Sequence, residues 1–257
     1  MMELTFLGTG WSHGVPSIGC DCPVCKGKAP RNRRRRSSIR LRDDESSVVI
    51  DVGPDFRDQA LTFEVDRLDA VFLTHEHADH VMGLDDVRRY SWLRGEPLPI
   101  LGSDAVIKRL KVLYPYASSE KREGKAVPLI KMIPWTEQKK IGEMAFTPFS
   151  VPHGDIDCVG IRIDGPTGSI GYVPDCSDLP PEAVEILQGV DIMILNALRV
   201  TPHPSHLSLG QSVEWLVRIS AKQSYLTHMG CPLDYTVHGK ELPQGIEMAW
   251  DGLKVEI

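Results

Sequence analysis

The sequence of 257 residues lacks several features that would place it in a membrane or secreted class. It has no basic N-terminal region followed by an apolar run, and Glu3 interrupts the only early candidate, so we expect no signal peptide. No stretch approaches 18 consecutive apolar residues, so nothing is expected to span a membrane. Low-complexity tracts and short-period repeats are also missing. These absences predict a cytoplasmic protein, and the length is compatible with a single domain over residues 1–257.

Acidic residues outnumber basic ones overall, but one short segment concentrates positive charge. The formal net charge is −6, which argues against a general nucleic-acid binder, because affinity for phosphate backbones comes from clustered positive charge. Five arginines nevertheless lie within six residues: Arg31, Arg33, Arg34, Arg35 and Arg36. Such a run is usually solvated surface, and its functional interpretation is attraction of a phosphorylated substrate.

Alternating or continuous apolar runs bounded by turn residues predict strands throughout the chain. They cover residues 3–10, 47–53, 68–75, 98–103, 144–153, 158–164, 168–175, 191–198, 223–228 and 253–257. Helices are expected at 79–93, 103–113, 180–189 and 208–220, the last with Ser208 as N-cap. Residues 114–140 resemble a surface excursion. The pattern predicts an α/β fold with two sheets and helices outside.

The segment THEHADH, Thr74 to His80, directly follows a predicted buried strand. In an extended segment, side chains two apart point the same way, so His75 and His77 can face one ion together. Asp79 and His80 then open the first turn of the predicted helix and can lean back toward the same pocket. Four ligand-type side chains in six positions predict a metal site rather than an exposed polar turn.

Three more ligand candidates stand at the ends of predicted strands: His153 in FSVPHGD, Asp175 in GYVPDCS and His228 in SYLTHMG. Each alone has an ordinary explanation, since a loop histidine is usually solvated and an aspartate after a strand usually caps or turns. Together with the first motif they complete a set. Imidazoles and carboxylates suit zinc, manganese or iron, and two such ions can clamp the attacking and leaving oxygens of an ester.

In their order along the chain, these residues resemble the metallo-β-lactamase fold superfamily. The resemblance implies an αββα sandwich made of two similar halves. It implies two divalent ions, zinc or manganese, one held by His75, His77 and His153 and the other by Asp79, His80 and His228, with Asp175 bridging. A histidine directly after Asp79 is the pattern of the two-metal phosphodiesterases, thioesterases and lactonases of this fold, and most of its β-lactamases lack it.

The cysteines point to a further metal site. Cytoplasmic thiols stay reduced, so six cysteines are better interpreted as metal ligands or buried thiols than as disulfides. The pattern C-x-C-x-x-C offers three thiolates, whereas a closed zinc site needs four ligands. Cys231 lies three residues beyond His228, on a loop beside the predicted active site. We therefore expect a structural zinc in an insertion at about residues 19–38, held by Cys20, Cys22, Cys25 and Cys231. Cys158 and Cys176 are expected in the core.

A narrower resemblance rests on the stretches FLGTGWSHGVPSIGCDCPVC, GLDD, PHPSHLSL and YLTHMGC. These are similar to the PhnP branch of the superfamily, whose named member is a phosphoribosyl cyclic phosphate phosphodiesterase. The sequence departs from that branch at Cys231, where relatives usually carry histidine, and at Asn196, where they tend to have aspartate. A thiolate can replace the histidine on zinc, so the zinc site is expected to survive.

His206, in PHPSHLSL, aligns with a histidine that relatives use beside the metals. The resemblance assigns catalysis to His206 and Asp79. A positioned imidazolium at His206 would protonate the departing oxygen, which contributes about 10²–10⁴-fold in rate. Phosphate binding is the second interpretation of His206, and His203 is the weaker candidate. His13 and His238 are expected at the surface.

The predicted function is hydrolysis of a small phosphodiester, a cyclic phosphate of a ribose or nucleotide. The expected substrate contacts are Arg34, Arg35, Arg36 and His206. The expected partner is a small phosphorylated molecule rather than a long nucleic acid, and analogy with relatives suggests a homodimer.

Three other functions compete with this prediction. A transfer-RNA 3′-processing nuclease normally carries a long arm rich in glycine and proline, which the short segment 114–140 lacks. A thioesterase or lactonase would not need the arginine run. A non-catalytic nucleotide-binding or zinc-scaffold protein is disfavoured by the complete set of ligands.

Overall fold

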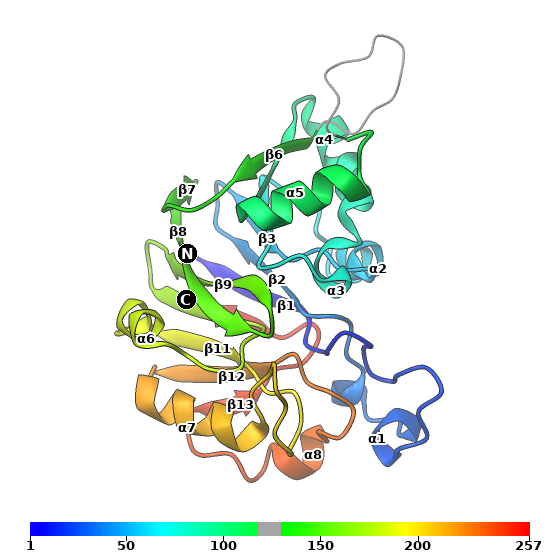
Figure 1. The fold of residues 1–257 in the computed structure, drawn as a ribbon, viewed down its shortest axis with the longest axis vertical. Coiled ribbons are helices and arrows are strands. Elements are labelled where there is room, and N and C mark those ends of the chain that lie inside the picture. The colour runs from blue at the N-terminus through cyan, green and yellow to red at the C-terminus, as the bar shows by residue number, and fades with distance from the viewer. Residues whose placement is uncertain (118–129) are drawn as a thin grey trace.

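The computed structural model describes residues 1–117 and 130–257, which form two packed mixed sheets with helices on the outer faces (Figure 1). The first sheet has the strand order β14-β1-β2-β3-β4-β5-β6. Its strands are β1 (Glu3–Gly8), β2 (Ser38–Arg42), β3 (Ser47–Ile50), β4 (Ala70–Phe72), β5 (Leu98–Gly102), β6 (Ile130–Pro134) and β14 (Lys254–Glu256). The predicted α/β sandwich is confirmed.

The second sheet has the order β13-β12-β11-β10-β9-β8-β7. Its strands are β7 (Lys139–Ile141), β8 (Met144–His153), β9 (Ile156–Asp164), β10 (Ser169–Val173), β11 (Ile192–Asn196), β12 (Gln223–Thr227) and β13 (Ile246–Met248). The α-helices are α1 (Pro23–Lys26), α2 (Phe56–Thr62), α3 (Ala78–Val81), α4 (Arg88–Arg94), α5 (Asp104–Leu113), α6 (Pro181–Leu187), α7 (Leu209–Ile219) and α8 (Tyr235–His238). Two 3₁₀ turns, η1 (Pro30–Asn32) and η2 (Leu84–Val87), complete the described elements.

Successive side chains of a strand point to opposite faces of its sheet, so the apolar residues form one core between the two sheets and one core on the outer face of each sheet. In β1, Phe6 lies between the sheets and Leu7 lies on the outer face. Tyr172 of β10 enters the same inner core from the second sheet. Helices α2 and α5 cover the outer face of the first sheet, whereas α6 and α7 cover that of the second (Figure 1). Each face is therefore closed by an amphipathic layer.

Helix α7 begins where the sequence predicts. Ser208 accepts a hydrogen bond from the Gln211 backbone, and the Gln211 side chain accepts one from the Ser208 backbone. This capping box satisfies backbone donors that a helix start leaves unpaired. None of the helices in the described ranges combines the length and apolar character needed to cross a bilayer.

The single helix predicted over residues 79–93 is wrong, because the segment is divided into α3, η2 and α4. The break lies at Gly83, whose backbone N–H donates to the Val52 carbonyl at 2.8 Å. A Cβ on Gly83 would lie 2.1 Å from the Gly53 carbonyl oxygen, so only glycine permits this approach. The contact draws the segment onto the end of β3 and interrupts the helix.

The surface excursion predicted over residues 114–140 is also wrong in part. Strand β6 extends the first sheet and β7 extends the second, so the final third of the segment belongs to the sheets. Residues 118–129 lie outside the described ranges. Short edge strands such as these carry a weak sequence signal, since their side chains are only partly buried.

Candidate metal centre

The first group of predicted ligands comes from the segment after β4 and from the end of β8. His75 and His77 follow β4, and their Nε2 and Nδ1 atoms lie 3.0 Å apart. His153 ends β8 and places its Nε2 3.3 Å from His77 Nδ1. His75 and His153 are buried, and His77 is exposed. The strands thus bring three imidazole nitrogens to one point, as the H-x-H spacing predicts.

The second group lies directly beside the first. Asp79 Oδ2 is 3.3 Å from His80 Nε2 and 3.5 Å from His228 Nε2. Asp175, after β10, lies among them, with Oδ2 at 3.1 Å from His80 Nε2 and Oδ1 at 3.2 Å from His228 Nε2. The same Oδ1 is 4.0 Å from His153 Nε2 of the first group. Asp175 therefore occupies the position between the groups that a bridging ligand requires.

Unpartnered atoms test whether this arrangement fits metal ions. Buried side-chain atoms rarely lack a hydrogen-bond partner. Among the described residues, several that do lack one converge here: His80 Nε2, Asp175 Oδ2, His206 Nδ1, His228 Nδ1 and His228 Nε2. Imidazole nitrogens and carboxylates are the donors that zinc and manganese accept. The residues fit two divalent ions, and the assignment of each ligand to an ion stays a prediction.

Neighbouring groups fix the orientation of three of the rings. His153 Nδ1 donates to the Ser205 carbonyl at 2.8 Å, which leaves its Nε2 free to bind. His75 Nδ1 lies 3.0 Å from Thr74 Oγ1, and His80 Nδ1 lies 2.7 Å from Asp51 Oδ2. Such partners hold the tautomer and aim of metal-binding histidines.

Asp51 is the residue that the sequence analysis missed. It is fully buried after β3, has φ of +65°, and also accepts from the Thr74 backbone at 2.9 Å. A left-handed backbone at a non-glycine residue is strained, which is typical of functional sites. The available signal was an aspartate ending the apolar run SVVID, the same context that marked Asp175.

Electrostatics in the centre match metal ligands. Burial lowers the pKa of His75 far below its usual range, so its ring is neutral. Burial would raise the pKa of Asp175, but His228 and His80 outweigh it and hold this pKa well below the usual range. Around His80 the carboxylates of Asp79 and Asp51 overcome burial and raise its pKa. This excess of carboxylate charge is an environment that a divalent cation would neutralise.

His206 lies against both groups of ligands. Its Nδ1 is 3.3 Å from Asp175 Oδ1, its ring centroid is 4.7 Å from that of His153, and its side chain is 13% exposed. Burial first, and then the neighbouring His228, lowers the pKa of His206 to about 3. The ring therefore borders the centre as a neutral imidazole. His203 is one step farther out, with its centroid 5.2 Å from that of His206.

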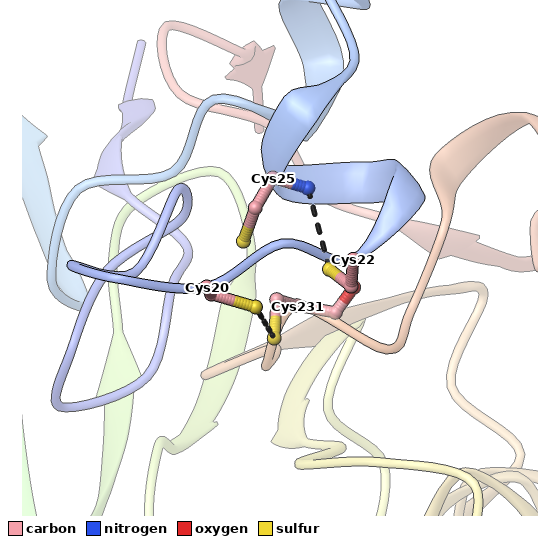
Figure 2. Close-up of side chains that lie close together, drawn as sticks. All are labelled: Cys20, Cys22, Cys25 and Cys231. Atoms are coloured by element: carbon pink, nitrogen blue, oxygen red, sulfur yellow. Dashed lines mark hydrogen bonds between the residues drawn. The ribbon is translucent and has the colours of Figure 1, made fainter.

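The four predicted cysteines also come together, and Figure 2 shows their sulfurs converging from the segment around α1 and from the loop after β12. Cys20 Sγ and Cys231 Sγ are 3.8 Å apart, and all four sulfurs lie within 4.8 Å of one another. A tetrahedron of sulfurs about 2.3 Å from zinc has edges of about 3.8 Å. The backbone N–H of Cys25 donates to Cys22 Sγ and lowers the pKa of Cys22 to about 7. The group fits zinc, and its occupancy stays a prediction.

Backbone hydrogen bonds join the loop that carries these cysteines, here called the knuckle (residues 15–34 with Cys231), to the metal centre. Met229, next to His228, donates its N–H to the Thr9 carbonyl at 2.9 Å and accepts from Trp11 N–H at 3.3 Å. Gly230 then donates to the Leu198 carbonyl at 2.9 Å. The segment from His228 to Cys231 is thus pinned at each step between one ligand of each site.

The arginine run does not face the centre as one patch. Arg34 is 2% exposed and donates to the Gly230 carbonyl at 3.3 Å and to Asn32 Oδ1 at 3.0 Å. The prediction that Arg34 contacts substrate is therefore wrong, because its guanidinium is enclosed beneath the knuckle. Its charge acts first on Asp251 and Asp234 and then on Cys231 and Cys25 of the knuckle.

Arg35 and Arg36 have acidic partners of their own. Arg35 Nε pairs with Asp58 Oδ2 at 2.5 Å, and Arg36 Nη1 pairs with Asp55 Oδ1 at 2.9 Å. The Arg36 side chain is 27% exposed. Gly53 packs between Arg36 and Asp79: a Cβ built on Gly53 would lie 3.5 Å from Arg36 Cβ and 2.0 Å from the Asp79 carbonyl oxygen. Arg36 therefore lies near the predicted ligand Asp79. The contact of the two arginines with substrate stays a prediction, and the position of Arg36 is the more favourable.

A cavity of about 370 Å³ opens between the ends of β5 and β6 and the β8–β9 hairpin. Val151 and Ile156 line it on either side of His153 in the sequence. The backbone N–H of Val159, another lining residue, donates to the carbonyl of Thr74 at 3.1 Å, next to His75. The wall also includes Ser103, Trp135, Thr136, Phe149, Ser150 and Asp157. None of the predicted ligands lines the cavity, which is linked to the centre through the backbone of Val159 and the residues beside His153 and combines aromatic with hydroxyl and carboxylate groups.

Comparison with known proteins agrees with this geometry. Residues 46–229 match the family model described as beta-lactamase superfamily domain. The crystal structure of a diphosphatase from the PhnP family superposes with a TM-score of 0.92 at 38% identity, covering 100% of this chain and 98% of that one.

Two curated relatives are longer proteins. An octanoyltransferase of Porphyromonas gingivalis is 33% identical over 100% of this chain and 52% of its own length. A ribonuclease Z of Bradyrhizobium sp. is 29% identical over 65% of this chain and 51% of its own. The chain thus matches about half the length of each of these relatives.

Proposed function

Because the chain belongs to the beta-lactamase superfamily and is a hydrolase of that fold, we propose that it hydrolyses a small phosphodiester, specifically a ribose or nucleotide cyclic phosphate. The carrying observation is the set of ligand side chains converging in two groups with Asp175 between them. The PhnP-family diphosphatase, at 38% identity, supports a phosphoryl substrate.

The side chains divide the work of the reaction. When bound, two divalent ions would activate water and draw charge from the phosphoryl oxygens. Asp175 lies between the two groups of ligands, and Asp51 and the Ser205 carbonyl keep the rings of His80 and His153 aimed. His206 borders the space beside Asp175 and is placed to give a proton to the departing oxygen once an anionic substrate raises its pKa.

Two surfaces beside the centre can hold the rest of the substrate. The cavity has the size of a sugar or base and offers Ser150 and Asp157 for hydrogen bonds. On the other side, the partly exposed guanidinium of Arg36 can attract the phosphate. Both features favour a compact organic phosphate over a simple inorganic one.

The octanoyltransferase that is 33% identical over this whole chain is matched over only 52% of its own length, so it does not decide between the phosphodiesterase and the thioesterase or lactonase alternative. The nuclease alternative is favoured by the ribonuclease Z relative. Against it, the sequence of segment 114–140 lacks the glycine- and proline-rich arm expected of such a nuclease; residues 118–129 of that segment lie outside the described ranges.

Side-by-side assays of the purified protein, loaded with manganese or zinc, test the proposal. We expect hydrolysis of bis-p-nitrophenyl phosphate and of ribose or nucleotide cyclic phosphates, with negligible action on β-lactams and glutathione thioesters. Thioester or lactone cleavage without phosphodiester cleavage would overturn the proposal, and trimming of precursor transfer RNA would favour the nuclease. Cleavage of a dinucleoside diphosphate alone would move the substrate class from esters to anhydrides.

A further inference from the structure

Cys176, next to the predicted bridging ligand Asp175, is held by a closed pair of hydrogen bonds. Its carbonyl oxygen accepts from Asn196 Nδ2 at 3.1 Å, and its thiol donates to Asn196 Oδ1 at 3.1 Å. Both side chains are fully buried. Because a carbonyl can only accept, the orientation of the Asn196 amide is unambiguous.

The same carbonyl also holds the loop of His206. The Leu207 backbone N–H donates to the Cys176 oxygen at 3.0 Å, so one oxygen receives hydrogen bonds from both Leu207 and Asn196. A small displacement of Cys176 would therefore move Asp175 on one side and His206 on the other. Asp175, the predicted bridging ligand, and His206, the predicted proton donor, are therefore both linked to the Cys176 carbonyl.

Asn196 occupies a rigid place in the second sheet. It ends β11 between the parallel strands β10 and β12, in register with Thr227, the residue before His228. Ser212 of α7 donates its hydroxyl to the Asn196 carbonyl at 2.6 Å. Asn196 is thus tied to the helix and to the neighbouring strand end, while its side chain reaches across to Cys176.

We propose that Asn196 is a positioning residue that sets the bridging carboxylate of Asp175 and the ring of His206 together, through the carbonyl of Cys176. The Cys158 thiol, which donates to the Asp175 carbonyl at 3.3 Å, supports the same backbone from β9. The inference rests on the proposed two-metal function. It gives a role to a buried amide that the reaction itself does not use.

Asn196→Leu is the decisive variant, because it keeps about the size of the side chain and removes the N–H that donates to the Cys176 carbonyl. Metal-free protein is titrated with Mn²⁺, and free Mn²⁺ is measured by electron paramagnetic resonance. The affinity for the second manganese ion is expected to fall about 10–100-fold. The exchange-coupled signal of the manganese pair should change as well. Turnover of esters with poor leaving groups should fall more than that of p-nitrophenyl esters, since the His206 loop shifts too.

Two further variants keep the test interpretable. Asn196→Asp, which installs the residue that relatives tend to carry here, can still donate to the Cys176 carbonyl when its carboxyl is protonated, so it should keep manganese affinity within about threefold of wild type. Ser212→Ala loosens Asn196 from the opposite side without touching Cys176. It should lower the melting temperature while leaving manganese affinity within about threefold of wild type, well short of the loss expected at the positioning residue.

The possible results distinguish failure of the Asn196 inference from failure of the proposed two-metal function. Unchanged manganese affinity in folded Asn196→Leu, or an equal loss of affinity in Asn196→Asp, would overturn the inference alone. An equal loss of affinity in Ser212→Ala would also overturn it, since general destabilisation would then suffice. Wild-type protein that binds fewer than two ions outside the knuckle would overturn the proposed function and the inference with it.

Discussion

Loss of one thiolate should remove a single zinc ion from the knuckle and leave the metal centre filled. Cys231→Ser takes one corner from a group whose Cys20–Cys231 sulfur separation, 3.8 Å, already matches a zinc tetrahedron. We expect purified wild-type protein to hold three ions per chain and Cys231→Ser to hold two. Cys22→Ser should behave in the same way, because its low pKa marks it as the readiest thiolate of the group.

The effect on stability follows from how the knuckle is attached. Structural zinc in small peptides is worth about 10–16 kcal/mol, but there the metal organises the whole fold. Here the base of the knuckle is held by the Val15–Arg34 backbone pair, with both hydrogen bonds at 2.8 Å. Much of the loss should therefore appear as local opening. We expect a loss of about 2–4 kcal/mol, which lowers the melting temperature by about 4–16 °C in a chain of this size.

Two control variants sharpen this measurement. Cys231→His substitutes another zinc ligand and should retain three ions, because zinc accepts three thiolates and one imidazole. Cys158→Ser removes a buried thiol outside the knuckle and should also retain three. Metal content by mass spectrometry and melting by scanning calorimetry are the assays. A stable Cys231→Ser protein with its full zinc content would remove Cys231 from the site and refute the reasoning.

Five other substitutions test the remaining assignments. His206→Ala should keep both ions of the centre and lose about 10²–10⁴-fold in kcat on esters with poor leaving groups, with a much smaller loss on p-nitrophenyl esters; equal losses would assign His206 to substrate binding. Asp175→Ala should lose metal content and activity together, as measured on the same preparation. Arg34→Met should lower the melting temperature without changing KM, whereas Arg36→Met should raise KM; the reverse result would restore Arg34 as the substrate contact. Burial raises the pKa of Asp251 to about 7, above its unfolded value, so its contribution to stability is full below about pH 4 and lost as pH rises through 7. Urea unfolding should show that the free energy of unfolding of the wild type falls by up to about 4 kcal/mol between pH 4 and pH 7, and that Asp251→Asn lacks this fall. The same pH dependence of stability in both proteins would contradict the assignment.

The sequence was most informative where a functional side chain follows a regular element directly. His75 and His77 stand two apart after a buried strand, His153 ends β8, and Asp175 and His228 follow β10 and β12 within two residues, so strand prediction and residue type together locate them. The carboxyl ends of parallel strands share an edge of their sheet, which is why local signals assemble into one site. Asp51 carries the same signal and could have been found by the same rule.

The arginine run shows what such reasoning cannot reach. The partners of Arg35 and Arg36 are Asp58 and Asp55, and the Arg35 backbone donates to Asp251 across the whole chain. Nothing in a run of like charges reveals which distant groups will face it. The prediction for Arg34 therefore failed on burial, a property that depends on how the knuckle folds over the sheet.

The segment from His228 to Cys231 links the two predictions on which the function depends. Its first residue is a predicted ligand of the centre, with φ of +52°, and its last is a predicted ligand of the knuckle. A non-glycine residue in that conformation persists only where its surroundings impose it. Here the imposing contacts are the backbone pairs of Met229 with Thr9 and Trp11, at the root of the knuckle. An ordered knuckle therefore helps to hold His228 in its strained, ligand-ready conformation, which gives a structural zinc a direct bearing on the chemistry of a neighbouring site.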